Sequence, residues 1–450
     1  MNEVLTELLK IKGKSSVGIA GCLCTTVLSE TLKKSVDKPI AGAGPLYSLT
    51  LRLNLDQLDP HSPRLELLRQ QSQEEADFFN PDNVSAILRF IKKQYVYEHV
   101  VLATWDHGSG YAIFTTPDPV KKAPNGQPIP GKKAVVMHPD HHAPVHRLFD
   151  REALLKHAGK LRGKAHLKEF VDMLDENLQW LSPPRGLTMD HLRQAIKDSF
   201  GHVEVIFMRN CFMQMFDTGF ALREVTDYLV ACESLMYFAA YDYDIFLNVL
   251  EANADTITSA EVASAAILGF TKCRVEASIR SDTALFGNQL SYYDALDKCI
   301  NRMTEELIRY AQGNKNALLR CRRTLTDIVR ADYKASGFQL VDALLWFKKA
   351  ASLMAGSKKY WDALQEFLVY HQQMVGDRQF VGKLLGGGGY RESGFSLYFP
   401  TYQRNIEKYR SFYELYYALK TPFRSEFTRY SCWDEFIGYL FLDLTPDSLV

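Results

Sequence analysis

The sequence predicts an α/β protein with a mainly parallel sheet flanked by helices, followed by a largely helical C-terminal region. Three observations support this prediction. Strand-like apolar runs alternate with amphipathic helical segments through residues 1–250. The runs at 100–104 and 203–208 are mostly apolar, as expected for strands of a parallel sheet covered on both faces. In residues 251–450 the apolar side chains recur mainly at helical spacing.

The first strands and helices follow one another in regular order. Residues 15–24 indicate a short strand and turn, and residues 25–36 a helix. Residues 46–55 alternate apolar and polar side chains, which predicts a further strand. Asn80 is the expected N-cap of an amphipathic helix that runs to about Tyr95, and the strand at 100–104 comes directly afterwards.

Residues 115–166 differ in composition, because prolines, glycines and two lysine pairs interrupt any regular pattern. We expect a mobile insertion in the catalytic half of the chain here. Beyond it, Thr188 is the expected N-cap of a helix that leads to the strand at 203–208. Helical spacing recurs at 260–270, 292–310, 317–333 and 341–354, and a late strand at about 394–400 is expected to return to the core.

Composition restricts the class of protein. Of the 450 residues, 46% are hydrophobic and 24% are charged, which is typical of a globular protein in water. The 53 basic and 53 acidic residues balance, so we expect neither nucleic acid nor a membrane as a partner. No apolar run reaches the roughly 18 residues of a membrane-spanning helix. The segment Met1–Glu7 lacks the features of a signal peptide, so we expect a cytoplasmic protein unless a longer native N-terminus carries a targeting segment.

The cysteines and histidines do not indicate a metal centre. The 8 cysteines lack paired metal-ligand spacing and fit a reducing compartment better than a disulfide framework. His138, His141, His142 and His146 cluster in the proline-rich insertion, which we interpret as a solvated segment. We therefore predict no metal ligands.

Two strand ends carry residue types that suit covalent catalysis. The strand ending at Thr104 leads to His107 and Gly108, and the strand ending at Met208 leads to Cys211. Functional groups gather at the carboxyl ends of the strands in such sheets. An imidazole that accepts the thiol proton produces a thiolate, which attacks a carbonyl carbon. The amides of Gly108 and Cys211 would then face the oxyanion.

The residue types alone leave a second interpretation of Cys211 open. A cysteine that follows a strand is often a small, buried core residue without a chemical role. If the site is catalytic, Asp106 or a backbone group is the candidate for orienting the imidazole of His107.

Several motifs together resemble the clostripain-like cysteine peptidases, which have a caspase-like sheet. Trp105–Gly110 matches the family's aromatic-Asp-His-Gly-Ser-Gly motif, and Met208–Met213 is similar to its cysteine motif. Tyr228–Glu233 is similar to the family's next strand, and Ala240–Asp244 is similar to its Gly-Trp-x-Tyr segment. Glu392–Pro400 is similar to the family's late Tyr-Phe-Pro strand. These matches occur in the family's order, and their combination is more specific than any one of them.

The resemblance implies a cysteine endopeptidase that acts on a protein or peptide substrate. Cys211 would be the nucleophile and His107 the proton acceptor and donor, and the reaction would pass through an acyl-enzyme thioester. The chemistry would need no cofactor, and the sequence does not indicate a structural calcium ion. Two other classes stay open: a catalytically weak or inactive caspase-like binding or regulatory module, and a thiol hydrolase or transferase with a non-peptide substrate.

The cysteine motif departs from the family pattern at Arg209. Members that cleave after Arg or Lys carry an aspartate at the matching position, in or beside the S1 pocket. A guanidinium there would repel a basic P1 side chain, so P1 would be acidic or neutral. Alternatively, Arg209 pairs with Asp242 or Glu233 beside the same pocket and braces the loop.

Family members are often activated by cleavage between the histidine and cysteine motifs, which corresponds to residues 115–166 here. If S1 rejects lysine, self-cleavage at the lysine pairs is not expected. A site such as Asp140 or Asp150, or a separate activating protease, would then be needed. A zymogen segment or a regulatory partner would restrain an enzyme of this kind.

Overall fold

The structure is a computed structural model, and it describes residues 8–9, 17–25, 30–40, 47–55, 64–71, 78, 80–106, 108, 110, 112–113, 186–233, 236, 241–276, 283–326, 340–381, 393–399 and 425–442. The predicted base His107, the insertion expected at 115–166, Asp140 and Asp150 therefore lie outside the described residues.

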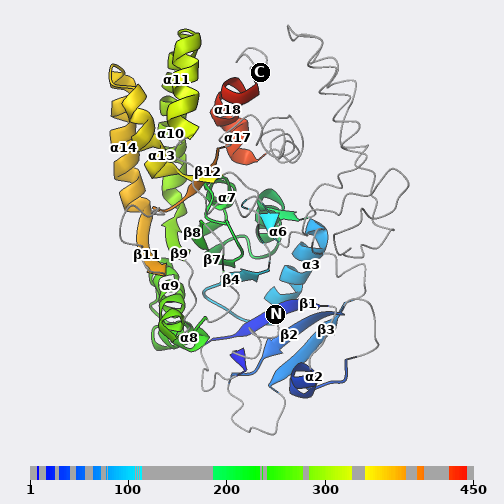
Figure 1. The fold of residues 1–450 in the computed structure, drawn as a ribbon. Helices are drawn as coiled ribbons and strands as arrows, with labels where there is room; N and C mark the ends of the chain where they lie inside the picture. Colours follow the sequence, from blue (N-terminus) through cyan, green and yellow to red (C-terminus); the bar gives the residue numbers. More distant parts are fainter. Residues whose placement is uncertain are drawn as a thin grey trace, which may run out of the picture.

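A five-stranded sheet forms the centre of the molecule (Figure 1). Its order is β11 (Val375–Val381), β9 (Thr283–Gln289), β8 (Thr226–Cys232), β7 (Val203–Arg209) and β4 (Val101–Trp105). β7 lies between β4 and β8 and runs parallel to both. β9 is antiparallel to β8 and to β11, so β11 points in the same direction as β8. Four of these strands share one direction, which confirms the predicted α/β fold with a mainly parallel sheet.

The two faces of this sheet contribute to different hydrophobic cores. Along β7, Ile206 and Met208 belong to one core, whereas Val205 and Phe207 belong to the other. This alternation follows from the two-residue period of a β-strand. Because both faces are covered, nearly every side chain of β7 is buried.

Helices from both halves of the chain build the first core. They are α3 (Pro81–Lys92), α6 (Met189–Ser199), α7 (Phe216–Leu222), α10 (Tyr293–Gln312), α11 (Lys315–Thr326), α13 (Ala343–Ala350), α14 (Lys358–Met374), α17 (Glu426–Tyr430) and α18 (Trp433–Leu442). The second core contains α8 (Tyr243–Ala252), α9 (Ser259–Glu276) and the N-terminal strands.

The helices next to the predicted site begin where the sequence predicts. The side chain of Asn80 accepts a hydrogen bond from the amide of Asp82 at the start of α3, and Pro81 occupies the first helical turn. The hydroxyl of Thr188 accepts a hydrogen bond from the amide of His191 at the start of α6. Both caps therefore agree with the sequence prediction, whereas α3 ends at Lys92, before Tyr95.

Contrary to the sequence prediction, the N-terminal strands do not belong to the central sheet. β1 (Ile19–Thr25), β2 (Tyr47–Leu53) and β3 (Leu65–Gln70) form a separate antiparallel sheet in the order β1-β2-β3, and the short helix α2 (Glu30–Ser35) lies between β1 and β2. Leu49, Thr50 and Leu51 of β2 are all buried, and Arg52 is bonded to Glu66 across the β2–β3 pair.

Two short sheets complete the arrangement near the predicted site. β5 (Ala112–Ile113) pairs with β6 (Leu187–Thr188), so the two ends of the segment 114–186 lie side by side. β10 (Leu340–Asp342) pairs with β12 (Ser396–Tyr398), and Ser396 of β12 also forms a bridge with Met215. The late strand therefore contacts the chain just beyond Cys211. Two 3₁₀ turns, η3 (Leu290–Tyr292) and η4 (Ala351–Leu353), precede α10 and follow α13.

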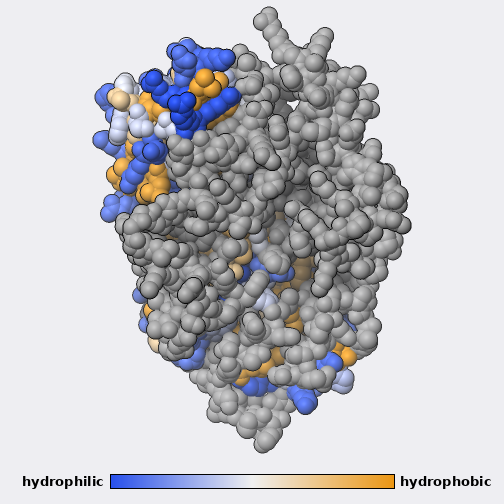
Figure 2. Space-filling view, viewed as in Figure 1, coloured by the Kyte–Doolittle hydropathy of each residue, from blue (hydrophilic) through white to orange (hydrophobic). Residues whose placement is uncertain are grey.

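The C-terminal helices pack beside one another at one end of the molecule (Figure 1). Their outward surface mixes hydrophobic and hydrophilic side chains (Figure 2). Leu319 of α11 and Val369 of α14 are among the exposed apolar residues. Within the described part of the chain, no helix combines the length and apolarity needed to cross a bilayer.

Candidate active site

The carboxyl ends of β4 and β7 lie next to each other. These strands pair in parallel register, with Trp105 opposite Arg209 at their last positions. The residues that follow, which include Asp106 and Gly108 on one side and Cys211 on the other, therefore leave the sheet at the same edge. This is the arrangement that the sequence predicts for the two strand ends. His107 itself lies outside the described residues.

Gly108 makes direct contact with the main chain of Cys211. A Cβ atom added to Gly108 would lie 2.5 Å from the carbonyl oxygen of Cys211 and 3.0 Å from its nitrogen. It would also lie 2.8 Å from Cβ of Asn210. No amino acid with a side chain fits at such distances without movement of the backbone. Glycine at this position therefore allows the histidine loop to approach the cysteine turn.

A second glycine anchors the same loop to α7. Gly110 has a φ of 88°, and an added Cβ would collide with the side chain of Met215. The carbonyl oxygen of Gly110 accepts a hydrogen bond of 2.5 Å from the hydroxyl of Thr218. Gly108 also forms a β-bridge with Ile113. The described ends of the loop are thus held from two directions.

Cys211 lies in a tight turn directly after β7. The next residue, Phe212, has a φ of 62°, a conformation that residues with a side chain rarely adopt. Such backbone strain occurs preferentially at functional sites. The Cys211 side chain is partly buried and packs against both cores. No disulfide engages it.

The environment of the Cys211 thiol raises its pKa. Burial disfavours the thiolate and raises the pKa above the ordinary value, and a hydrogen bond with the backbone of Met236 acts in the opposite direction. The amide of Met236 lies 3.3 Å from Sγ of Cys211, and Sγ lies 3.6 Å from the Met236 carbonyl oxygen. Without a proton acceptor, Cys211 would be a thiol at neutral pH. A nucleophilic role therefore requires a base.

The side chain of Arg209 packs against two aromatic rings. It is 4% exposed, and Nη1 donates a hydrogen bond of 2.6 Å to the hydroxyl of Tyr243. Its guanidinium carbon lies 5.4 Å from the ring centroid of Tyr241 and 5.6 Å from that of Tyr243. These distances are those of cation–π interactions.

The two acids predicted beside Arg209 hold other parts of the chain. The carboxylate of Asp242 accepts a hydrogen bond of 3.1 Å from the amide of Ile245 and caps α8. Glu233 is fully buried, and its Oε1 accepts hydrogen bonds from the amides of Ser393 and Gly394 at 3.1 and 2.8 Å. Both acids therefore have structural roles.

Asn210 is a member of this site that the sequence analysis does not single out. It is completely buried between the ends of β4 and β7. The hydroxyl of Thr104 donates to Oδ1 of Asn210 at 2.6 Å, and Nδ2 of Asn210 donates to the carbonyl oxygen of Asp106 at 3.1 Å. The position directly before the cysteine is the one sequence signal that could have identified it.

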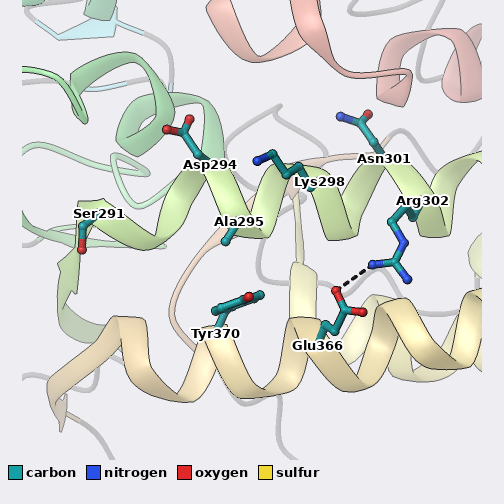
Figure 3. Close-up of a pocket in the computed structure, with 8 residues that line it drawn as sticks. All are labelled: Ser291, Asp294, Ala295, Lys298, Asn301, Arg302, Glu366 and Tyr370. Carbon is teal, nitrogen blue, oxygen red and sulfur yellow. Dashed lines mark hydrogen bonds and ion pairs between the residues drawn. The ribbon is translucent and has the colours of Figure 1, made fainter.

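A groove of about 610 Å³ lies elsewhere, between α10 and α14 (Figure 3). Arg302 of α10 and Glu366 of α14 point toward each other across it and form an ion pair of 2.6 Å. The residues that line it include neither cysteine nor histidine. We therefore place no chemistry there, because the reactive residue types lie at the ends of β4 and β7.

The described residues contain no group of three or more histidine, cysteine or acidic side chains arranged to hold a metal ion. The four histidines of the segment 138–146 lie outside the described part of the chain.

Comparison with known proteins identifies a family. The sequence profile of the clostripain family matches residues 184–440, which is more than half of the chain. The matched region includes Cys211 and excludes His107. No curated protein matches the sequence.

Solved structures of cysteine proteases are similar to the chain over most of its length. A secreted C11 cysteine protease from Bacteroides thetaiotaomicron has 13% identity and a TM-score of 0.48, over 80% of this chain and 81% of that one. An inactive zymogen of a C11 protease from Parabacteroides distasonis has 12% identity and a TM-score of 0.47, over 82% of this chain and 81% of that one. On the strength of the profile match, this chain belongs to the clostripain family of cysteine peptidases.

Proposed function

We propose that this cysteine peptidase is an endopeptidase that uses Cys211 as its nucleophile and His107 as its base. The observation that carries the proposal is the contact between the main chain of Gly108 and that of Cys211. This contact brings the loop that contains His107 to the turn that contains Cys211. Thiol catalysis requires a cysteine and a base that lie close together in space, and here the two are about 100 residues apart in the sequence.

The proposed reaction proceeds through a thioester. His107 accepts the proton of the Cys211 thiol, and the thiolate forms a bond with the carbonyl carbon of the scissile peptide. The tetrahedral intermediate then expels the amine, which takes the proton from the imidazolium. A water molecule, deprotonated by His107, attacks the thioester and releases the carboxylic acid, and the proton returns to Sγ of Cys211.

The raised pKa of Cys211 is compatible with this role. Burial disfavours an isolated thiolate, but an imidazolium beside it would compensate by charge attraction. The amides of Gly108 and Cys211 are the proposed oxyanion donors. Their proximity is supported by the 3.0 Å between the ideal Cβ of Gly108 and the nitrogen of Cys211.

Replacing each member of the proposed dyad tests this mechanism. Cys211→Ala should abolish hydrolysis of a fluorogenic peptide, and His107→Ala should lower kcat by about 100-fold or more while the protein stays folded. Cys22→Ala is a matched control, because Cys22 is also a partly exposed free cysteine but lies in the N-terminal sheet. Full activity of Cys211→Ala would rule the mechanism out.

We further propose that P1 is not Arg or Lys. The supporting observation is the guanidinium of Arg209, which lies two residues before the nucleophile and packs against the rings of Tyr241 and Tyr243. A positive charge there would oppose a basic P1 side chain, and an acidic or neutral one would be accepted. In the alternative interpretation Arg209 only braces the loop, and its cation–π contacts support that equally.

A panel of peptides that differ only at P1 separates these interpretations. If Arg209 selects the substrate, Arg209→Ala should lower kcat/KM for peptides with an acidic P1 residue by about 10-fold more than kcat/KM for peptides with alanine at P1. Tyr243→Phe is the matched control, because it removes the hydroxyl that accepts from Arg209 but keeps the ring and the charge. Strong cleavage after Arg by the wild type would contradict the proposed specificity.

A second candidate function is a binding or regulatory module of low activity. The observation that favours it is the raised pKa of Cys211, since a persistent thiol is a poor nucleophile. This candidate predicts that the protein binds peptides but hydrolyses them slowly. Substitution of Cys211 would leave that slow rate unchanged.

A further inference from the structure

We propose that Asn210 is a positioning residue whose side-chain amide joins the histidine loop to the nucleophile turn. The inference rests on the proposed Cys211–His107 dyad. It concerns how the two partners are kept at a reactive separation, and it assigns Asn210 no contact with the substrate.

Hydrogen bonds from both ends of this amide reach the chain at the end of β4. Oδ1 accepts from the hydroxyl of Thr104 at 2.6 Å, and Nδ2 donates to the carbonyl oxygen of Asp106 at 3.1 Å. Asn210 itself immediately precedes Cys211. One rigid, planar amide, on the residue between β7 and the nucleophile, is therefore bonded to the residues on either side of Trp105.

The bond to Asp106 bears directly on the proposed base. The carbonyl group of Asp106 belongs to the peptide unit that joins Asp106 to His107. A peptide unit is planar, so holding its oxygen restricts the orientation of the whole unit. The carbonyl oxygen of Asp106 can only accept, so the Nδ2 end of the amide points to it, and the Oδ1 end is left to accept from the Thr104 hydroxyl.

Burial makes this bridge sensitive to small changes. Asn210 is 0% exposed, and Thr104 is also buried, so water cannot readily replace a lost partner. The main chain of Asn210 is held as well, because its carbonyl oxygen lies 3.7 Å from Sγ of Cys232 on the neighbouring strand β8. The amide is therefore attached to the sheet, and the loop is the part that it positions.

A small displacement of a catalytic pair is enough to slow the reaction strongly. An error of about 1 Å in the placement of reacting groups lowers rates by about 100-fold. Asn210→Asp preserves the shape and the acceptor for Thr104 but replaces the donor to Asp106 with a carboxylate oxygen. Two oxygens would then face each other, so we expect the Asp106 peptide unit to turn away.

The experiment follows the thiol and the kinetics in the full-length protein. Iodoacetamide alkylation of Cys211 is measured as a function of pH in the wild type, His107→Ala and Asn210→Asp, together with kcat and KM for a fluorogenic peptide. We expect Asn210→Asp to lower kcat by about 10- to 100-fold with KM nearly unchanged. Its alkylation profile should move toward that of His107→Ala.

Two controls separate positioning from a general loss of stability. Thr104→Ser keeps the hydroxyl that donates to Asn210 and should therefore show the wild-type alkylation profile. Asn288→Asp alters another fully buried asparagine, whose Nδ2 donates to Tyr293 and to the carbonyl oxygen of Gly394. It should lower the melting temperature without shifting the thiol profile.

The outcomes distinguish this proposal from the mechanism on which it rests. If His107→Ala shifts the profile and folded Asn210→Asp does not, the role of Asn210 is wrong and the dyad stands. If His107→Ala has no effect, the dyad itself fails. Should Asn210→Asp not fold, Thr104→Val decides: a lower kcat with a shifted profile supports the bridge, and wild-type values overturn it.

Discussion

The ideal Cβ position of Gly108 lies 2.5 Å from the carbonyl oxygen of Cys211. The histidine loop and the cysteine turn are therefore in contact through their backbones, with no space for a side chain between them. We expect Gly108→Ala to separate the two loops, to lower kcat/KM by at least about 10-fold and to reduce stability by about 1–3 kcal/mol.

The matched control for this substitution is Gly356→Ala. A Cβ at Gly356 would meet nothing within 4 Å, so this variant should keep wild-type activity and stability. Peptide hydrolysis and chemical denaturation measure both effects. Wild-type kcat/KM in Gly108→Ala would show that the close approach is not needed for catalysis.

Activation should depend on the nucleophile if the peptidase processes itself. We expect the purified wild type to yield two fragments, because the resemblance to the clostripain-like peptidases implies cleavage between the histidine and cysteine motifs. Cys211→Ala should stay in one piece, and replacing Asp140 and Asp150 by Asn should prevent cleavage if the enzyme prefers an acidic P1 residue. Denaturing gels and mass spectrometry of the new termini identify the site. Fragments in the Cys211→Ala variant would instead indicate a separate activating protease.

Stability should fall as the pH rises through the range in which Asp297 ionises. Burial raises the pKa of Asp297 to about 6, whereas Arg223 lowers it to a smaller extent. The unfolded chain has the ordinary value of 3.8, so between about pH 4 and pH 6 the folded state binds more protons. The free energy of unfolding therefore decreases over that window.

Asp297→Asn removes this ionisation and keeps the oxygen that accepts from Asn301. Relative to the wild type, the variant should gain about 1–3 kcal/mol of unfolding free energy at pH 7 and little at pH 4. Denaturant titrations at the two pH values measure the difference. An equal effect at both would show that the charge of Asp297 does not matter.

The tyrosine that holds Arg209 should contribute to stability. Its hydroxyl accepts a hydrogen bond of 2.6 Å from a buried guanidinium, and bonds to charged groups are stronger than neutral ones. Tyr243→Phe should therefore lower the unfolding free energy by about 1–3 kcal/mol. A thermal melt monitored by circular dichroism is sufficient, and no change would indicate that Arg209 finds another partner.

Local sequence patterns predict the elements around the site. The N-caps Asn80 and Thr188 are recognisable because their side chains bond to amides only two or three residues ahead. The strand that ends at Arg209 is recognisable because it is buried on both faces. The strand that ends at Trp105 has a similar apolar run, but it lies at the edge of the sheet and most of its side chains are only partly buried.

Features that depend on distant partners could not be predicted in the same way. β9 and β11 complete the central sheet, yet Gly287-Asn288-Gln289 and Gly376-Asp377-Arg378-Gln379 give them little apolar character. They become strands by pairing with β8 and with each other. The antiparallel N-terminal sheet was likewise missed, because alternation identifies a strand but not its neighbours.

The contacts of Asn210 belong to the same class. Its amide bonds to residues more than 100 positions away, at the end of a strand whose neighbour in the sheet the sequence does not specify. The sequence likewise does not specify that Arg209 packs against two tyrosines that follow β8.

The central claim is that Cys211 is activated by His107, and covalent labelling tests it most directly. The wild type, Cys211→Ala and His107→Ala are treated at neutral pH with peptidyl acyloxymethyl ketones carrying different P1 residues, and the modified site is located by mass spectrometry. We predict one label on Cys211 of the wild type, none on Cys211→Ala and at least about 100-fold slower labelling of His107→Ala. Equal labelling rates for the wild type and His107→Ala, or a label on another cysteine, would contradict the account.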